Sequence, residues 1–123
     1  MSPEELLAHA DAMATNAYAP YSNYLVGAAA LARDGRVFAG ANVENAAYPL
    51  GICAERSAIS KAAGEGLRPG DLEAIAINAS PCGGCRQWIH EWQFDRVYFR
   101  RADGSVAEYA ADDLLPDTWD LPQ

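Results

Sequence analysis

The chain has 123 residues and a formal net charge of −8, because 17 Asp and Glu outnumber nine Lys and Arg. This length suits one domain around one core, which we expect to span residues 1–123. Nucleic-acid binding depends on clustered Lys and Arg, so the acidic balance argues against a polynucleotide partner and favours a small molecule. No apolar run approaches the roughly 18 residues that cross a bilayer, and we expect no membrane contact.

The first predicted element is an amino-terminal helix. Ser2, Pro3 and Glu5 form a capping box with proline at the first helical position. An apolar stripe with helical spacing follows at Leu6, Leu7, Ala10, Met13, Ala14 and Ala17. Pro20 predicts the end of this helix. The start of the chain has neither the basic residues nor the apolar core of a signal peptide, which favours a cytoplasmic protein.

Two strands and a second helix are predicted next. Residues 25–33 and 36–44 are strand-like, and the Asp-Gly pair at 34–35 between them is a strong hairpin signal. A helix is predicted from Cys53 to Glu65, where several glycine and proline residues close it.

The second half of the chain adds three strands and one helix. Residues 74–77 are typical of a buried strand, and Pro81 starts a helix that we expect to run to Trp92. Strands are predicted at 96–101 and 105–109, joined by a second Asp-Gly turn. This order predicts an α/β fold in which helices cover a mixed five-stranded sheet.

All three cysteines fall in two short motifs, Cys-Ala-Glu at residues 53–55 and Pro-Cys-Gly-Gly-Cys at residues 81–85. A zinc ion held by three protein ligands keeps its fourth position for water, which is the arrangement of a catalytic site. We therefore expect Cys53, Cys82 and Cys85 to bind one Zn²⁺, with a carboxylate beside it.

Other interpretations of the cysteines are weaker. An odd number leaves one thiol unpaired in any disulfide scheme. A structural zinc site normally has four ligands, and the only two histidines of the chain are His9 and His90. His9 lies in the amino-terminal helix and His90 lies five residues beyond Cys85, so we expect both to be surface or packing residues.

Each cysteine lies at the start of a predicted helix, where free backbone N–H groups and the helix dipole favour thiolate over thiol. Three thiolates on one Zn²⁺ leave a net negative charge, which weakens the ability of the metal to acidify water. Arg56, one turn from Cys53, is placed to donate hydrogen bonds to a thiolate and offset this charge. Arg86 is a weaker candidate for the same role.

Further motifs carry a family resemblance. They are Val-Gly-Ala-Ala at 26–29, Asn-Val-Glu-Asn-Ala-Ala-Tyr at 42–48, Cys-Ala-Glu-Arg at 53–56 and Ser-Pro-Cys-Gly-Gly-Cys-Arg-Gln at 80–87, with shorter matches at 19–22 and 114–116. With the zinc-deaminase signature of the cysteine motifs, they make the chain resemble the small homotetrameric cytidine deaminases over nearly its whole length. The resemblance implies a three-layer fold, one Zn²⁺ per chain and a homotetramer. The implied reaction is hydrolytic deamination of cytidine or deoxycytidine to the uridine and ammonia, a step of pyrimidine salvage.

The resemblance also implies the residues of the chemical step. Glu55 would take a proton from water, deliver it to ring N3 and then pass a proton to the departing amine. The backbone beside Cys82 and Ala54 would help to bind the base.

Substrate contacts are implied in the same way. Asn42 and Glu44 stand two residues apart on one predicted strand, so both point to one face, where they would bind the 3′-hydroxyl of the sugar. Tyr24 stands where the family usually has a phenylalanine near the sugar and base. Trp119 stands where a family phenylalanine stacks on the base bound by a neighbouring subunit.

One connection departs from the family pattern. Residues 78–81 join the third predicted strand to the second cysteine motif more directly than in most relatives. In the family fold this connection lies near the zinc and the 4-amino side of the base, so a short one favours an open pocket there. We therefore expect tolerance of some 4-N-substituted cytidines, unless Trp88 or Trp119 fills the space.

Three other functions share part of the pattern. A deaminase of a modified or antibiotic aminopyrimidine nucleoside would carry the same motifs, and this alternative stays open. A polynucleotide-editing deaminase needs basic or aromatic contacts to a single strand, which the net charge argues against. A non-catalytic zinc module would have no use for Glu55.

Overall fold

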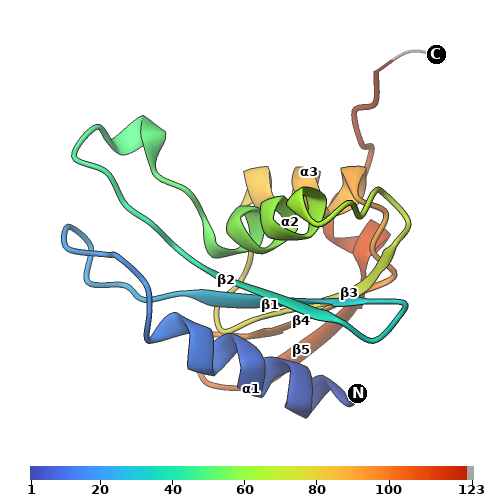
Figure 1. The fold of residues 1–123 in the computed structure, drawn as a ribbon, viewed down its shortest axis with the longest axis horizontal. Coiled ribbons are helices and arrows are strands. Elements are labelled where there is room, and N and C mark those ends of the chain that lie inside the picture. The colour runs from blue at the N-terminus through green and yellow to red at the C-terminus, as the bar shows by residue number, and fades with distance from the viewer. Residues whose placement is uncertain (122–123) are drawn as a thin grey trace.

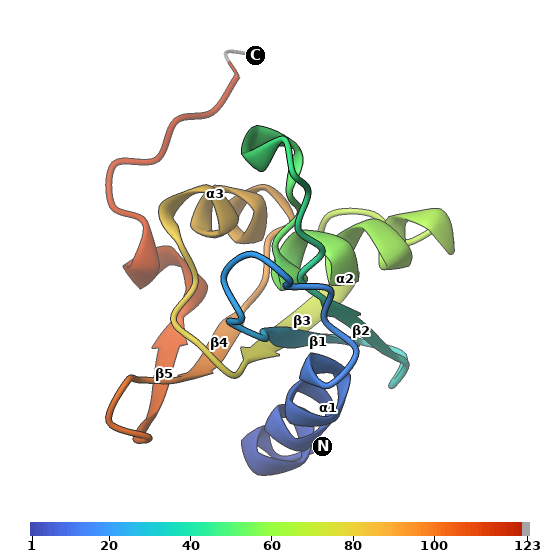
Figure 2. The ribbon, with the colours of Figure 1, turned by 90° about the vertical axis from the view of Figure 1, so that its left-hand side faces the viewer.

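A computed structural model describes residues 1–121 of the chain as three layers, with one five-stranded sheet between helices. Helix α1 covers one face of the sheet, and α2 and α3 lie side by side on the other (Figures 1 and 2). The elements are α1 (Pro3–Ala14), β1 (Gly27–Ala32), β2 (Val37–Ala41), η1 (Tyr48–Leu50), α2 (Ala54–Gly64), β3 (Leu72–Ile77), α3 (Gly83–Glu91), β4 (Arg96–Arg100), β5 (Val106–Ala110) and η2 (Ala111–Leu114). The predicted α/β class and mixed five-stranded sheet are confirmed.

The strands lie in the order β2-β1-β3-β4-β5. The β3–β4 pair is parallel and is connected through α3, whereas the other three pairs are antiparallel. A parallel pair needs a crossover, and α3 supplies it on the face that also carries α2. Both cysteine motifs therefore lie on one side of the sheet.

The capping box of α1 is present as predicted, with Ser2 and Glu5 each accepting a hydrogen bond from the other's backbone N–H. The helix ends at Ala14, six residues before Pro20, so the end predicted from the sequence is too late. After Ala14 the backbone bonds shorten to i→i−3 turns at Asn16 and Ala17, and these turns close the helix without proline.

One face of the sheet packs against α1. Its apolar cluster consists of Leu6, Leu7, Ala10, Ala29, Leu31, Ala74 and Ala76. A Cβ on Gly27 would lie 2.0 Å from the carbonyl oxygen of Ala10, so only glycine allows this approach. The other face holds the larger cluster, in which Ala54, Ala58 and Ile59 of α2 meet the strands.

The predicted hairpin is confirmed, with Gly35 at a φ of +95°. Its strands are shorter than the predicted ranges 25–33 and 36–44, because the β1–β2 ladder starts at Gly27 and ends at Ala41. Beyond the ladder, Val43 makes isolated bridges to Tyr18 and Ile52 instead.

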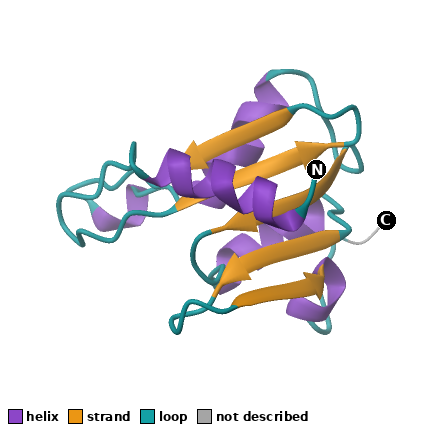
Figure 3. Ribbon diagram, turned by 90° about the horizontal axis from the view of Figure 1, so that it is seen from below, coloured by secondary structure: helices purple, strands orange, loops and turns teal. Residues whose placement is uncertain are grey.

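Residues 15–26 and 42–53 extend beyond the end of the sheet as two neighbouring loops (Figures 1 and 3). We call them the loop pair. Eight large apolar side chains of the loop pair are exposed: Tyr18, Tyr21, Tyr24, Leu25, Val43, Tyr48, Leu50 and Ile52. Within residues 1–121, no helix has the length and apolar character needed to cross a membrane.

Candidate metal centre and active site

The three cysteines meet at the amino termini of α2 and α3. Cys53 is the N-cap of α2, Cys82 is the N-cap of α3, and Cys85 lies in the first turn of α3. Their Sγ atoms all lie within 4.8 Å of one another. Both helices therefore direct their free N–H groups and positive dipole ends towards one point, which stabilises anionic sulfur.

Interaction with Cys85 is the main cause that lowers the pKa of Cys53 to about 6, and it outweighs partial burial. The same interaction and burial raise the pKa of Cys85. The close approach of Cys85 therefore favours the thiolate form of Cys53. The thiolate is the form in which cysteine binds a metal ion, so three sulfurs gathered in this way favour a bound cation.

A soft divalent metal fits this donor set. Three sulfurs of one kind, held by two helices, are the ligands that zinc takes in proteins. Among residues 1–121, Cys53, Cys82 and Cys85 form the one group of three or more potential ligands whose donor atoms lie close enough to hold an ion. His90 belongs elsewhere, because its Nε2 lies 2.7 Å from Oδ1 of Asp120.

Glu55 lies in the first turn of α2 and is only 4% exposed. Among residues 1–121, Glu55 is the one polar or charged residue that is buried. Burial raises the pKa of this carboxyl, and the nearby Cys53 charge adds to the effect. A buried carboxyl with a raised pKa beside a cluster of potential metal ligands is a candidate for proton transfer.

Arg56 approaches the cysteines from the first turn of α2. Burial acts to lower the pKa of its guanidinium, but interaction with Cys85 and the charges of the three sulfurs outweigh burial and raise it. Its Nε is buried and has no hydrogen-bond partner. A Cβ on Gly84 would lie 2.2 Å from Nη2, so the guanidinium lies directly against the Cys-Gly-Gly-Cys turn.

Arg86, the weaker candidate for that position, is occupied elsewhere. Its Nε donates to the carbonyl oxygen of Pro81 at 3.0 Å, and its Nη1 donates to that of Leu114 at 3.2 Å. These bonds tie the start of α3 to the end of η2, so Arg86 has a structural position rather than one against the sulfurs.

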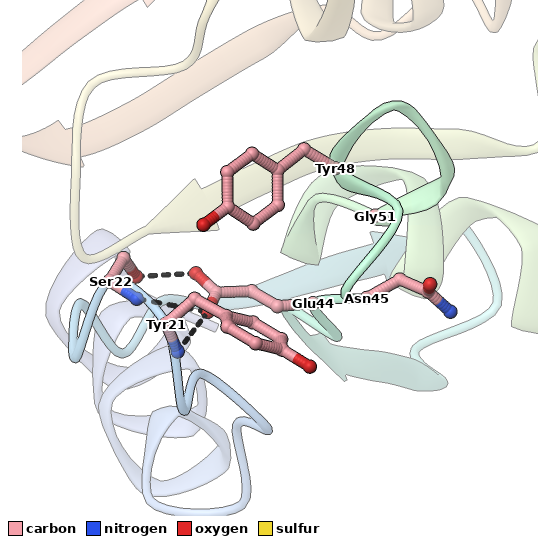
Figure 4. A pocket seen from close by; sticks show the side chains of 6 residues that line it. All are labelled: Tyr21, Ser22, Glu44, Asn45, Tyr48 and Gly51. Atoms are coloured by element: carbon pink, nitrogen blue, oxygen red, sulfur yellow. Dashed lines mark hydrogen bonds between the residues drawn. The ribbon is translucent and has the colours of Figure 1, made fainter.

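Asn42 and Glu44 both reach the segment at residues 21–26. The Asn42 side chain accepts from the N–H of Val26 and donates to the carbonyl oxygen of Tyr24, both at 2.9 Å. Glu44 accepts from the backbone N–H groups of Tyr21 and Ser22 and from the Ser22 hydroxyl (Figure 4). These hydrogen bonds lower the pKa of Glu44, with the Ser22 hydroxyl contributing most.

The other predicted substrate contacts differ in exposure. Ala54 is the first residue of α2 and is fully buried. Tyr24 is 61% exposed and Trp119 is 67% exposed. The carbonyl oxygen of Trp119 accepts from Nε2 of Gln87 on α3 at 3.3 Å, which holds the tail near this helix while the indole remains in solvent.

A surface hollow of about 340 Å³ lies in the loop pair (Figure 4). It is lined by Tyr21, Ser22, Glu44, Asn45, Tyr48 and Gly51. The rings of Tyr21 and Tyr48 meet edge to face, with centroids 5.8 Å apart. Of the predicted site residues only Glu44 lines this hollow, and none of the cysteines does.

Sequence reasoning did not single out Tyr21 and Ser22 as residues that hold Glu44. The available signal was the motif at 19–22, which was matched as a whole without a role for either residue. Their bonds to Glu44 span more than 20 residues of sequence, a separation at which local patterns carry no information about pairing.

The chain matches the family model of the cytidine and deoxycytidylate deaminase zinc-binding region over residues 1–101. It is 43% identical to the cytidine deaminase of Halalkalibacterium halodurans, over 94% of this chain and 92% of that protein. It is 41% identical to the cytidine deaminase of Sporosarcina psychrophila, over 94% and 90% of the two chains. A crystal structure of cytidine deaminase from Burkholderia pseudomallei is 44% identical and has a TM-score of 0.91, covering 97% of this chain and 100% of that one.

Proposed function

The chain belongs to the family of zinc-dependent cytidine and deoxycytidylate deaminases and catalyses hydrolytic deamination of cytidine, and we propose that Cys53, Cys82 and Cys85 hold its zinc while Glu55 moves the protons. The observation that carries this assignment is the burial of Glu55 beside the three gathered sulfurs. Burying a carboxyl without an ion-pair partner costs free energy, so a buried carboxyl beside such a cluster favours a functional role.

Zinc, when bound, supplies the Lewis acidity that makes a water molecule nucleophilic at neutral pH. Glu55 accepts a proton from the attacking water and delivers it to N3 of the pyrimidine, which makes C4 electrophilic. Glu55 then takes the proton of the hydroxyl newly formed at C4 and passes it to the 4-amino group, so that the C4 carbonyl forms as the C4–N bond breaks and ammonia leaves. Water thus adds at C4 and ammonia is lost, so cytidine becomes uridine.

Arg56 offsets the negative charge of the three thiolates. Its unpartnered Nε supports this role, because a buried N–H without an acceptor is costly and a thiolate is an acceptor. Weaker donation from the sulfurs to the metal leaves the metal a stronger acid. Ala54, the first residue of α2, contributes its backbone to the base-binding wall.

Asn42 and Glu44 bind the sugar. Both already hold the segment at 21–26, yet the Asn42 amide keeps a second N–H and a second lone pair, and a carboxylate accepts up to about four hydrogen bonds. A ribose or deoxyribose 3′-hydroxyl can use this remaining capacity. Tyr24 lines the approach to the sugar and the base.

The active form is a homotetramer in which neighbouring chains complete each pocket. Two observations support this assembly. The loop pair leaves eight large apolar side chains in solvent, and Trp119 near the carboxyl end is also exposed. Burial of these apolar side chains against other copies of the chain would stabilise the assembly.

The three free cysteines also favour a reducing compartment such as the cytoplasm, where thiolates remain available to metal. The substrates are cytidine and deoxycytidine. A modified aminopyrimidine nucleoside is the less favoured alternative.

A panel of cytidine, deoxycytidine, cytosine and 4-N-substituted cytidines tests the substrate assignment. Uridine or deoxyuridine is followed by chromatography and ammonia by a coupled assay, with heat-treated protein as the control. Equal amounts of nucleoside product and ammonia from cytidine or deoxycytidine are expected. No turnover of either nucleoside, with rapid turnover of another member of the panel, would favour the alternative.

A further inference from the structure

Two asparagines extend the sheet beyond the amino-terminal end of β1. The strands on either side of β1 are β2, which ends at Ala41, and β3, which ends at Ile77. The next residue in each case is an asparagine, Asn42 or Asn78. Each lies beside the segment 24–27, which leads into β1 from the loop pair.

The two side chains bond this segment from opposite edges. Asn42 accepts from the N–H of Val26 and donates to the carbonyl oxygen of Tyr24, both at 2.9 Å. Asn78 accepts from the N–H of Gly27 at 3.0 Å and donates to the carbonyl oxygen of Leu25 at 3.3 Å. Each side-chain amide thus takes one N–H and one C=O of the segment, as a peptide group in a β-ladder does.

The backbones of the two asparagines complete the pattern. The N–H of Asn42 donates to the carbonyl oxygen of Val26 at 3.1 Å, and the N–H of Asn78 donates to that of Gly27 at 3.2 Å. Residues 24–27 are therefore hydrogen-bonded along both edges by the two asparagines, where the ladders of β2 and β3 end. We call this arrangement the asparagine clamp.

The clamp determines which face Tyr24 presents. Side chains alternate along extended backbone, so residues 24, 26 and 28 share one face. Val26 and Ala28 pack with the cluster that contains Ala54, so this face is the one covered by α2. Tyr24 is 61% exposed, which means that the backbone, rather than packing around its ring, sets its position.

We propose that Asn78 is a positioning residue for nucleoside binding, which acts by holding residues 24–27 so that Tyr24 faces the side of the sheet where the cysteines and Glu55 lie. Asn78 itself makes no contact with substrate. This role rests on the proposed function and assigns to the residue after β3 a part in forming the wall of that same site. Without its two side-chain bonds, one edge of the segment is free to move away from the sheet.

The test is the steady-state kinetics of cytidine deamination by the wild type, Asn78→Ala and Asn78→Asp. Asn78→Ala removes both side-chain bonds, and we expect KM for cytidine to rise about tenfold while kcat changes less than about threefold. Asn78→Asp keeps the acceptor for Gly27 and loses the donor to Leu25, so its KM should fall between those of the other two. Inhibition by uridine should weaken most in Asn78→Ala and less in Asn78→Asp.

Asn16→Ala is the matched control, because Asn16 lies in the exposed turn after α1 and its amide contacts only Met13. It should leave KM and kcat unchanged. Zinc content and melting temperature are measured for every variant. An Asn78→Ala protein that melts at a lower temperature but keeps the wild-type KM would overturn the proposal, because it would show a purely structural role.

If Asn78→Ala does not fold, the comparison of Asn78→Asp with the wild type decides alone, since a KM within error of wild type contradicts the clamp. Wild-type protein that does not turn over cytidine would refute the proposed function instead. Wild-type turnover is therefore measured before any variant is compared.

Discussion

The cysteine corner and the loop pair lie at the same end of the molecule but are held together in different ways. The corner is formed by the first turns of α2 and α3, and the loop pair consists of residues 15–26 and 42–53. The corner gathers Cys53, Cys82, Cys85 and a buried Glu55 within one chain. The loop pair is held by hydrogen bonds from a few polar side chains and exposes its apolar residues. One chain therefore gathers the proposed metal ligands and the proposed catalytic carboxyl, whereas the exposed loop pair is where we propose that neighbouring chains complete the pocket.

The largest expected effect comes from the corner. Glu55→Gln preserves the shape of the side chain but cannot accept and release a proton, so kcat for cytidine should fall at least about 100-fold. Zinc and nucleoside binding should be retained. Turnover is followed by uridine formation, and zinc by elemental analysis. A variant with more than about a tenth of the wild-type rate would contradict the assignment of Glu55.

The packing of α2 on the sheet, which positions the corner, can be tested by substitution of a glycine in β2. A Cβ on Gly40 of β2 would lie 2.4 Å from the backbone N of Ala58 in α2, so Gly40→Ala forces the helix that carries Cys53 and Glu55 away from the sheet. We expect unfolding free energy to fall by about 1–3 kcal/mol, as overpacking usually costs, and activity to fall with it.

Gly64→Ala is the matched control for Gly40→Ala. It lies at the last residue of α2, where a Cβ meets nothing within 4 Å. Alanine is favoured over glycine in a helix, so the stability should stay the same or rise by up to about 1 kcal/mol. Urea denaturation measures both variants, and equal losses from the two would show that Gly40 does not set the approach of α2.

The loop pair is tested through assembly. Tyr48 is 74% exposed and Leu50 is 68% exposed, so charged residues there should cost one chain little while opposing burial between chains. The double variant Tyr48→Asp, Leu50→Asp should lower the mass in solution from four chains and reduce activity at least about tenfold, with zinc retained. Light scattering and cytidine turnover measure the two effects.

Val106→Asp is the control, because Val106 is an exposed apolar residue of β5, outside the loop pair. It should keep both mass and activity. A wild-type protein that is monomeric in solution and fully active would show that the exposed apolar residues serve another purpose.

The contrast between the two regions also explains what the sequence could predict. Cysteines at helix starts are defined by local spacing, so the positions of Cys53, Cys82 and Cys85 at the ends of α2 and α3 were predicted to within a residue or two. The α/β class and the mixed five-stranded sheet followed from the order of helices and strands, whereas the strand order β2-β1-β3-β4-β5 was not predicted.

The loop pair was predicted less well because its structure depends on distant side chains. Strands were expected at 25–33 and 36–44, but the segment at 24–26 is held by Asn42 and Asn78, which are 16 to 53 residues away in sequence. The helical stripe likewise continued in sequence to Ala17, while tight turns ended α1 at Ala14. Neither side-chain-to-backbone bond nor turn leaves a periodic signal.

The smallest expected effect concerns the short connection between β3 and α3. Five residues, 78–82, connect β3 to α3, and Trp88 packs against the core cluster rather than standing free beside that connection. We therefore expect slow but measurable conversion of 4-N-methylcytidine or 4-N-acetylcytidine to uridine. Chromatography of overnight incubations decides, with cytidine as the positive control. No uridine from either compound beside rapid cytidine turnover would mean that the space is filled.

The most direct test of the central claim is the zinc content of active wild-type protein, measured by elemental analysis together with cytidine turnover in the same sample. We predict one zinc per chain, with turnover lost on chelation and restored in proportion to the zinc added back. Full activity in protein without stoichiometric zinc would contradict the assignment of Cys53, Cys82 and Cys85 as the ligands of a catalytic metal.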